Sequence, residues 1–171
     1  YANGLQRQQF LGAIDQIKLN CDVYNLDGGV DYRLRALKRA GLYYFPLDKT
    51  AEAALEETFS KLSSPNSTVK TMVELQIEKR RILAFRIAGE IVWFQFCDIC
   101  EGPRSQNDYI QIAKEFKSVF ISSIPPLGAN NDNAARRFIH LVDEFYDRNV
   151  KLVLSAETSI EVLYSGVRLR T

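Results

Sequence analysis

The sequence is poor in cysteine and histidine, the residues that form disulfides and bind transition metals. Its three cysteines are Cys21, Cys97 and Cys100, and His140 is its only histidine. An odd and low cysteine count is typical of a reducing compartment. The single CxxC pair offers two of the four ligands that zinc requires, so Cys21 and His140 would have to complete a site. We therefore favour ordinary thiols near a strand end, at least one of them packed, and predict no metal site.

Long apolar runs and an excess of one charge are also absent. No stretch approaches the roughly 18 consecutive apolar residues of a membrane helix, and no secretory signal is present. The 22 basic residues face 21 acidic residues, for a net charge of +1. This balance predicts no strong attraction to nucleic acid or to an anionic membrane. The length of 171 residues, 46% of them hydrophobic, is enough for one core in one or two small domains.

The sequence lacks the phosphate-binding motif GxxxxGK[ST], whose backbone amides bind nucleotide phosphates. The chain alone is therefore predicted not to hydrolyse nucleotide. His140 could serve a Ser-His-Asp site only beside a placed nucleophile. It shares a polar helix face with Arg136, Asp143 and Asp147, which favours a solvated histidine. The chain opens on Tyr1 rather than Met, which indicates part of a longer protein.

Apolar periodicity predicts the secondary structure. Helices are expected at 3–20, 50–62, 109–116 and 131–149, with a short one at 160–164. Buried strands are expected at 23–26, 43–45, 119–122 and 152–155. Alternation at 73–77, 83–87 and 92–96, with turns at Lys79-Arg80 and Ala88-Gly89, predicts a three-stranded antiparallel meander. Because a helix joins the two later buried strands, we expect a parallel βαβ unit and a soluble α/β fold.

Three long blocks carry a family resemblance. They are NGLQRQQFLGAIDQIKLNCDVYNLDGGVDYRLR at 3–35, GPRSQNDYIQIAKEF at 102–116 and ARRFIHLVDEFYDRNVKLVLSAE at 135–157. In this order they resemble the ZapE-type cell-division ATPases, a family of the AAA+ class with mitochondrial relatives. The resemblance implies the C-terminal half of a P-loop AAA+ ATPase, with parallel strands and helices plus the antiparallel meander.

The resemblance also implies three segments. Residues 1–49 would end the ATPase core and carry an arginine-finger helix. Residues 50–98 would form a helix with the meander, and residues 99–171 would form a C-terminal α/β segment.

A function follows from the same resemblance. The full-length protein would be a homo-oligomeric, magnesium-dependent ATPase that acts on the division ring through a tubulin-like partner. ATP and Mg would be bound mainly by the missing N-terminal half, so this chain is expected to be inactive alone. The resemblance implies the bacterial cytoplasm, with the mitochondrion as the alternative. It allows peripheral membrane association and implies no nucleic-acid partner.

Three arginines are implied as site residues. Arg7, in GLQR, matches an arginine finger that reaches the nucleotide of the neighbouring subunit and stabilises charge on the transferred phosphoryl group. Arg137, in ARRF, resembles a sensor that contacts the terminal phosphate within its own subunit, although Arg136 competes for that role. Arg33, in DYRLR, is a further candidate nucleotide contact. The alternatives are ordinary surface arginines, with Arg137 paired to Glu144.

Other motif residues are interpreted as structural. Arg33, Arg35, Arg104 and Asp108 are expected to form Arg–Asp pairs that lock the junctions between segments. Asp108 could equally order a helix start, where the helix dipole favours an acid.

Two further expectations concern the later elements. Asp132 is expected to pair with Arg136 four residues on. Ser123 stands where relatives often have Asp, and Lys117-Ser118 where they often have His-Thr. We therefore assign no catalytic role to that strand.

A second class of function is a binding module without turnover. In this hypothesis the meander at 72–96 docks a division or membrane-quality-control partner. The basic turn Lys79-Arg80-Arg81 motivates it, although an isolated basic turn usually carries only solvated charge.

Overall fold

The computed structural model describes residues 12–13, 16, 19–20 and 42–165. The chain divides into two units, residues 1–30 and 31–171. In the first unit, the described residues of the predicted helix 3–20 are helical, and the Asn20 side-chain amide donates to the Gln16 carbonyl at 2.8 Å. The predicted strand at 23–26 lies outside the described residues.

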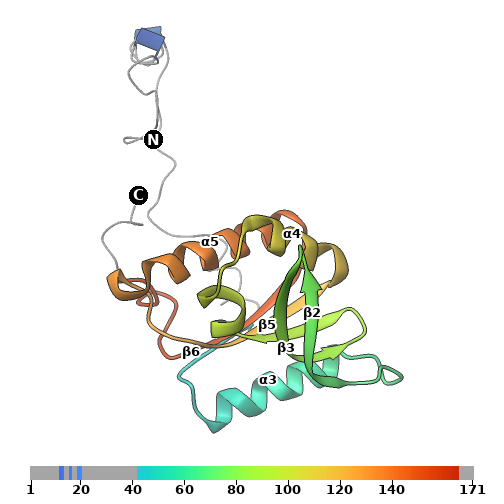
Figure 1. The fold of residues 1–171 in the computed structure, drawn as a ribbon. Coiled ribbons are helices and arrows are strands. Elements are labelled where there is room, and N and C mark those ends of the chain that lie inside the picture. Colours follow the sequence, from blue (N-terminus) through green and yellow to red (C-terminus); the bar gives the residue numbers. More distant parts are fainter. Residues whose placement is uncertain (1–11, 14–15, 17–18, 21–41, 166–171) are drawn as a thin grey trace. The chain divides into compact units, whose positions relative to one another are not determined.

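The second unit is built on one six-stranded sheet (Figure 1). The strand order across the sheet is β1-β6-β5-β4-β3-β2. The strands are β1 (Tyr43–Tyr44), β2 (Lys70–Ile77), β3 (Arg80–Ala88), β4 (Ile91–Gln95), β5 (Ser118–Ile124) and β6 (Lys151–Ala156). The neighbouring pairs β1–β6, β6–β5 and β5–β4 are parallel. The pairs β4–β3 and β3–β2 are antiparallel and form the meander.

The predicted fold class is therefore confirmed: parallel strands with helices, extended by a three-stranded meander. Described strands from each of the segments 1–49, 50–98 and 99–171 belong to this one sheet. The boundaries of those segments stay a prediction.

Helices cover both faces of the sheet. On one face lie α4 (Gln106–Glu115) and α5 (Asp132–Asp147), and on the other lies α3 (Lys49–Leu62), as Figure 1 shows. Each central parallel strand buries side chains toward both layers, which explains its continuous apolar run. Val119 and Ile121 belong to the core cluster of α5, whereas Phe120 between them belongs to the α3 cluster.

The α3 layer is held by aromatic contacts. Phe59 of α3 is 2% exposed, and its ring centroid lies 5.4 Å from that of Phe120 and 5.7 Å from that of Trp93. The helix begins after Asp48, whose carboxylate accepts the backbone N–H of Ala51 at 2.8 Å. Such a cap satisfies one of the free N–H groups at a helix start. The predicted helix at 50–62 is confirmed.

The first turn of the meander differs by one residue from the prediction. Glu78 and Lys79 form it, with φ angles of 45° and 65°. Two positive φ angles give the twist that a two-residue hairpin loop needs. Arg80 is thus the first residue of β3, opposite Ile77. The predicted turn at Lys79-Arg80 is wrong because the strand pairing continues to Arg80.

Two further elements differ from the sequence analysis. The predicted short helix at 160–164 is wrong, because this backbone pairs with Leu127 instead. The Leu127 amide donates to the Leu163 carbonyl at 2.7 Å, and the Ser165 amide donates to the Leu127 carbonyl at 2.8 Å. A π-helical turn, Cys97–Glu101, follows β4 and was not predicted. No helix in the described part of the chain is long and apolar enough to cross a bilayer.

Candidate functional site

The start of α4 carries a fully buried carboxylate, Asp108. One oxygen of Asp108 accepts the backbone N–H of Ser105 at 2.6 Å and the Ser105 hydroxyl at 3.0 Å. An acid at this position is favoured by the helix dipole and closes a capping box. The prediction that Asp108 orders the helix start is therefore confirmed.

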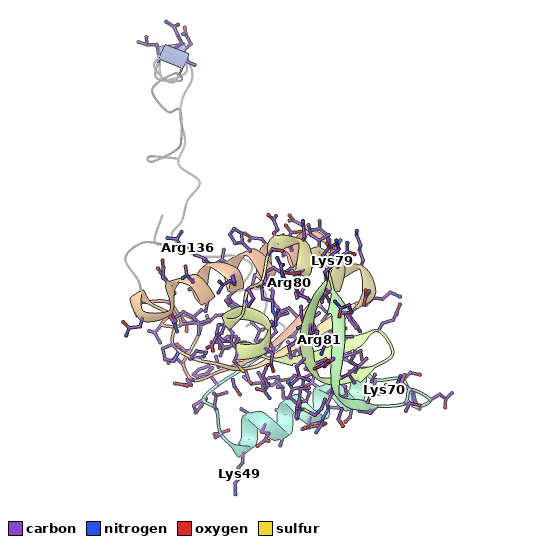
Figure 2. All side chains as sticks on the ribbon, in the orientation of Figure 1. Lys49, Lys70, Lys79, Arg80, Arg81 and Arg136 are labelled. Atoms are coloured by element: carbon purple, nitrogen blue, oxygen red, sulfur yellow. The ribbon has the colours of Figure 1, made fainter. Side chains whose placement is uncertain are left out.

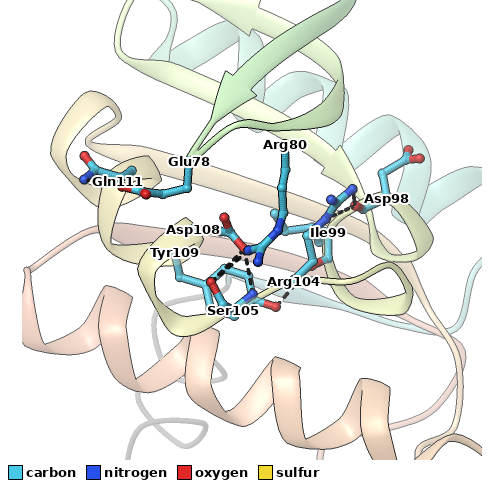
Figure 3. A network of polar contacts seen from close by, with 9 residues as sticks. All are labelled: Glu78, Arg80, Asp98, Ile99, Arg104, Ser105, Asp108, Tyr109 and Gln111. Atoms are coloured by element: carbon cyan, nitrogen blue, oxygen red, sulfur yellow. Dashed lines mark hydrogen bonds and ion pairs between the residues drawn. The ribbon is translucent and has the colours of Figure 1, made fainter.

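Arg80 neutralises this carboxylate. Its Nη1 lies 2.6 Å from the same Asp108 oxygen and 3.0 Å from the Ser105 hydroxyl (Figure 3). The side-chain amide of Gln111 adds a second contact from α4 to the hairpin, to Glu78 at 3.1 Å. The tip of the β2–β3 hairpin is thus fixed on the first turns of α4.

This arrangement corrects two expectations. The Arg–Asp pair at the junction exists, but the described arginine that pairs with Asp108 is Arg80 and not its motif neighbour Arg104. Arg80 therefore has a structural role, and its guanidinium is not available to a partner as a free basic group of the turn. No local pattern indicates this pair, because 28 residues separate its members and the contact depends on the register of the β2–β3 hairpin.

The remaining basic residues of the turn are more accessible. Figure 2 shows Lys79, Arg80 and Arg81 together at this end of the hairpin, with Lys70 near the other end of β2. Lys79 is exposed, and Arg81 is 76% exposed with a long, 3.5 Å contact to Glu74. Lys79 and Arg81 are therefore the members of the turn that a partner could reach.

The π-helical turn lies at the carboxyl end of β4, beside this junction. Arg104 donates from Nε and Nη2 to the Asp98 carbonyl at 3.1 and 2.9 Å. The Tyr109 hydroxyl donates to the Ile99 carbonyl at 3.2 Å. Arg104 is therefore structural, as predicted, although its partner is a backbone carbonyl.

Arg137 lies half-buried on α5. Its Nη1 donates to the Cys100 carbonyl at 3.1 Å. The alternative pairing with Glu144 is wrong, because Glu144 contacts Arg148 and Gln106 instead. The prediction that Arg137 contacts a nucleotide phosphate stays a prediction.

Two other expectations for α5 are confirmed. The Arg136 guanidinium pairs with Asp132 at 3.2 Å. His140 is exposed on the same helix, as expected of a solvated histidine. Arg7, Arg33, Arg35 and Cys21 lie outside the described residues. Their assigned roles stay predictions.

The CxxC pair has one accessible member. Cys97 is exposed and Cys100 is buried, so one thiol is packed as expected. Burial raises the pKa of the Cys100 thiol above its usual range, and the nearby Arg137 guanidinium acts in the opposite direction. Partial burial and the charge of Asp98 also raise the pKa of Cys97. Neither thiol is thus activated as a nucleophile.

The described residues offer no cluster of metal ligands for Mg. Among residues 12–13, 16, 19–20 and 42–165, no group of three or more His, Cys, Asp or Glu side chains could hold a metal ion. The phosphate-binding motif is also missing from the sequence. We therefore derive no step of hydrolysis from these residues.

Strand β5 contains a backbone irregularity at its carboxyl end. Ser123 is exposed and has a φ of 62°. Its backbone N–H donates a hydrogen bond to the Ser155 hydroxyl at 3.3 Å. The pairing with β6 shifts register between Ile121 and Ile124. Ordinary residues rarely adopt this conformation, but Asp and Asn tolerate it better.

Comparison with known proteins gives a consistent family. The model of the AFG1-like ATPase family matches residues 1–171. The cell division protein ZapE of Escherichia coli (strain K12) is 41% identical over 170 residues, covering 99% of this chain and 45% of that protein. Lactation elevated protein 1 homolog B of Danio rerio is 36% identical over 164 residues, covering 95% of this chain and 33% of that protein.

The chain therefore spans less than half the length of these relatives. The resemblance found in the three sequence blocks is confirmed, and it extends over segment 50–71, which those blocks left out. Because the family model matches from the first residue to the last, this chain belongs to the AFG1-like ATPase family.

Proposed function

We propose that the whole protein is an ATPase that acts in cell division and that this chain forms its C-terminal portion. The match of the AFG1-like ATPase model to residues 1–171 carries the proposal. The 41% identity to a cell division protein supports division as the process. ATP and Mg would be bound mainly by the part of the protein outside this chain, and the chain alone would be inactive.

Arg7 is the residue of this chain that we propose to act on the nucleotide. Its guanidinium would reach the active site of the neighbouring subunit and stabilise charge that develops on the transferred phosphoryl group. The enzyme would therefore be a homo-oligomer whose active sites lie between subunits. Arg33 is proposed as a second contact with the nucleotide.

The proposed partner is the tubulin-like protein of the division ring. ATP binding would change the shape of the oligomer and so its hold on that partner. We propose the bacterial cytoplasm as its location, because one relative is a cell division protein of Escherichia coli. The resemblance keeps the mitochondrion as the alternative and allows peripheral membrane association. A role on nucleic acid is not proposed, because the net charge is only +1.

Steady-state ATP hydrolysis by the whole protein tests the proposal. Arg7→Ala should lower kcat by roughly 10³-fold or more, as loss of an arginine finger does in other phosphoryl-transfer enzymes. The affinity for ATP should change little. Arg136→Ala is the matched control, because Arg136 is an exposed helix arginine paired with Asp132. An unchanged kcat in Arg7→Ala would make Arg7 structural, and a wild-type protein without ATP turnover would refute the ATPase itself.

A second candidate is a docking function of the β2–β3 hairpin. The exposure of Lys79 and Arg81 favours it. Lys79→Glu with Arg81→Glu should then abolish capture of the division partner by the whole protein, with Arg80 left intact to preserve the fold. Arg136→Glu reverses a charge on α5 as the control. Partner capture that survives the double reversal would exclude this docking site.

A further inference from the structure

The backbone carbonyls of the π-helical turn Cys97–Glu101 need hydrogen-bond donors from outside the turn. The last carbonyls of a helical turn lack partners within the turn and must be satisfied by other groups. Here these carbonyls belong to the successive residues Asp98, Ile99 and Cys100. They lie where β4 ends, the edge at which parallel sheets carry their functional residues. Short π-helical segments also occur frequently at functional sites.

Each of the three carbonyls accepts a hydrogen bond from a different side chain. Arg104 donates to Asp98, Tyr109 to Ile99 and Arg137 to Cys100, at distances from 2.9 to 3.2 Å. Figure 3 shows Arg104 beside Asp98 and Ile99, with Tyr109 on the neighbouring helix. The donors come from the loop before α4, from α4 and from α5. Two of the three family-like sequence blocks thus meet at this turn.

Arg104 and Arg137 donate their described hydrogen bonds to carbonyls of the turn. The other described arginines, 80, 81, 86, 136 and 148, each form an ion pair. A hydrogen bond from a charged donor to a carbonyl is stronger than one between neutral groups.

We propose that Arg104, Tyr109 and Arg137 are positioning residues that together hold the Cys97–Glu101 turn at the end of β4. Arg137 acts through the Cys100 carbonyl. The turn keeps the Cys97 side chain exposed and the Cys100 side chain buried. The phosphate contact that the resemblance implies for Arg137 is a separate prediction.

The reactivity of the Cys100 thiol reports whether the turn is closed or open. Its thiol is fully buried, and burial also raises its pKa. Since alkylating reagents attack the exposed thiolate, Cys100 can react only when the turn opens. Cys97, three residues earlier and exposed, provides an internal reference in the same peptide region.

The test is alkylation of the whole protein with iodoacetamide, with each cysteine followed by peptide mass mapping. In Arg137→Ala, Cys100 should react about tenfold faster than in wild type, since one charge-assisted hydrogen bond is lost. Cys97 should react at an unchanged rate. Arg136→Ala, one residue away, is the matched control and should protect Cys100 as wild type does.

Two results would overturn the proposal. One is protection of Cys100 in Arg137→Ala equal to that in Arg136→Ala. The other is faster alkylation of Cys97 together with Cys100, which would mean that Arg137→Ala loosens the surroundings and not the turn alone. The alkylation rates need no nucleotide, so they remain informative even if the protein proves not to be an ATPase.

Two milder variants keep the proposal testable if Arg137→Ala does not fold. Tyr109→Phe removes only the hydroxyl that donates to Ile99, so Cys100 should again react several-fold faster. Arg137→Lys keeps a charged donor and should restore most of the protection. Wild-type protection in Tyr109→Phe, or a lysine variant as unprotected as alanine, would refute a role for these hydrogen bonds.

Discussion

Single residues at the α4 junction show how a buried charge is accommodated. Asp108 is fully buried, and one of its oxygens receives the contacts from Ser105 and Arg80. Its other oxygen has no hydrogen-bond partner among the described residues. Arg80 therefore contributes the positive charge that makes burial of Asp108 tolerable. The preference of a helix start for an acid predicted the place of Asp108. Its arginine partner was not predicted, because the contact depends on the register of a hairpin.

Removing Arg80 should destabilise the fold, whereas removing Arg81 should not. Arg80→Ala leaves Asp108 buried without its counter-charge, which we expect to cost about 2 kcal/mol of unfolding free energy. This lies below the roughly 3–5 kcal/mol of a fully buried pair because Arg80 is 41% exposed. Arg81→Ala should change stability by less than about 0.5 kcal/mol. Urea unfolding of the two variants measures both effects, and equal losses would contradict this account of the junction.

Ser123 is a residue whose backbone conformation limits which side chains are tolerated at its position. Because its φ is 62°, Ser123→Gly should raise the unfolding free energy by about 0.5–1 kcal/mol, and Ser123→Val should lower it by about 1–2 kcal/mol. Thr71→Val is the control, since Thr71 is an exposed strand residue without a positive φ. Thermal unfolding gives the comparison. If valine is tolerated at Ser123 as well as at Thr71, the strand carries no strain there.

At the scale of elements, periodicity predicted the helices and strands with strong apolar patterns. The buried strands β5 and β6 and the helices α3, α4 and α5 all lie where the sequence indicated. Failures occurred where tertiary contacts override local pattern. The backbone around Tyr164 pairs with Leu127, so the segment 160–164 does not continue as a helix. The Cys97–Glu101 turn receives hydrogen bonds from α4 and α5. Neither contact has a local signature in the sequence.

The α3 layer should depend on one aromatic side chain. Phe59 is 2% exposed, and its ring packs against the rings of Phe120 and Trp93 on the side of the sheet that α3 covers. Phe59→Ala should lower the unfolding free energy by about 3–5 kcal/mol, the usual cost of truncating a buried aromatic. Glu57→Ala removes an exposed partner of Lys61 on the same helix and should leave the unfolding free energy nearly unchanged. A mild effect of Phe59→Ala in urea unfolding would mean that α3 is held by other contacts.

At the scale of the whole molecule, the chain supplies a sheet with both faces covered and a family membership. The described residues hold no cluster of metal ligands, and the proposed trans-acting Arg7 lies outside them. The role of Arg7 as an arginine finger was inferred from the resemblance of the GLQR motif to the family, and not from spacing or composition. A site completed by a neighbouring subunit cannot be deduced from the contacts within one chain, because its second half belongs to another copy.

A mixing experiment tests whether Arg7 acts between subunits. Two inactive forms of the whole protein would be combined: Arg7→Ala, and a second form with its phosphate-binding loop disabled. In a mixed oligomer, an intact loop can face an intact Arg7 from the other form, so ATP hydrolysis should reappear. With equal amounts and random assembly, about one interface in four would be active, because two independent conditions must each be met. Each form mixed with wild type controls for subunit exchange. If exchange occurs and no activity returns, Arg7 acts within its own subunit or only on the fold.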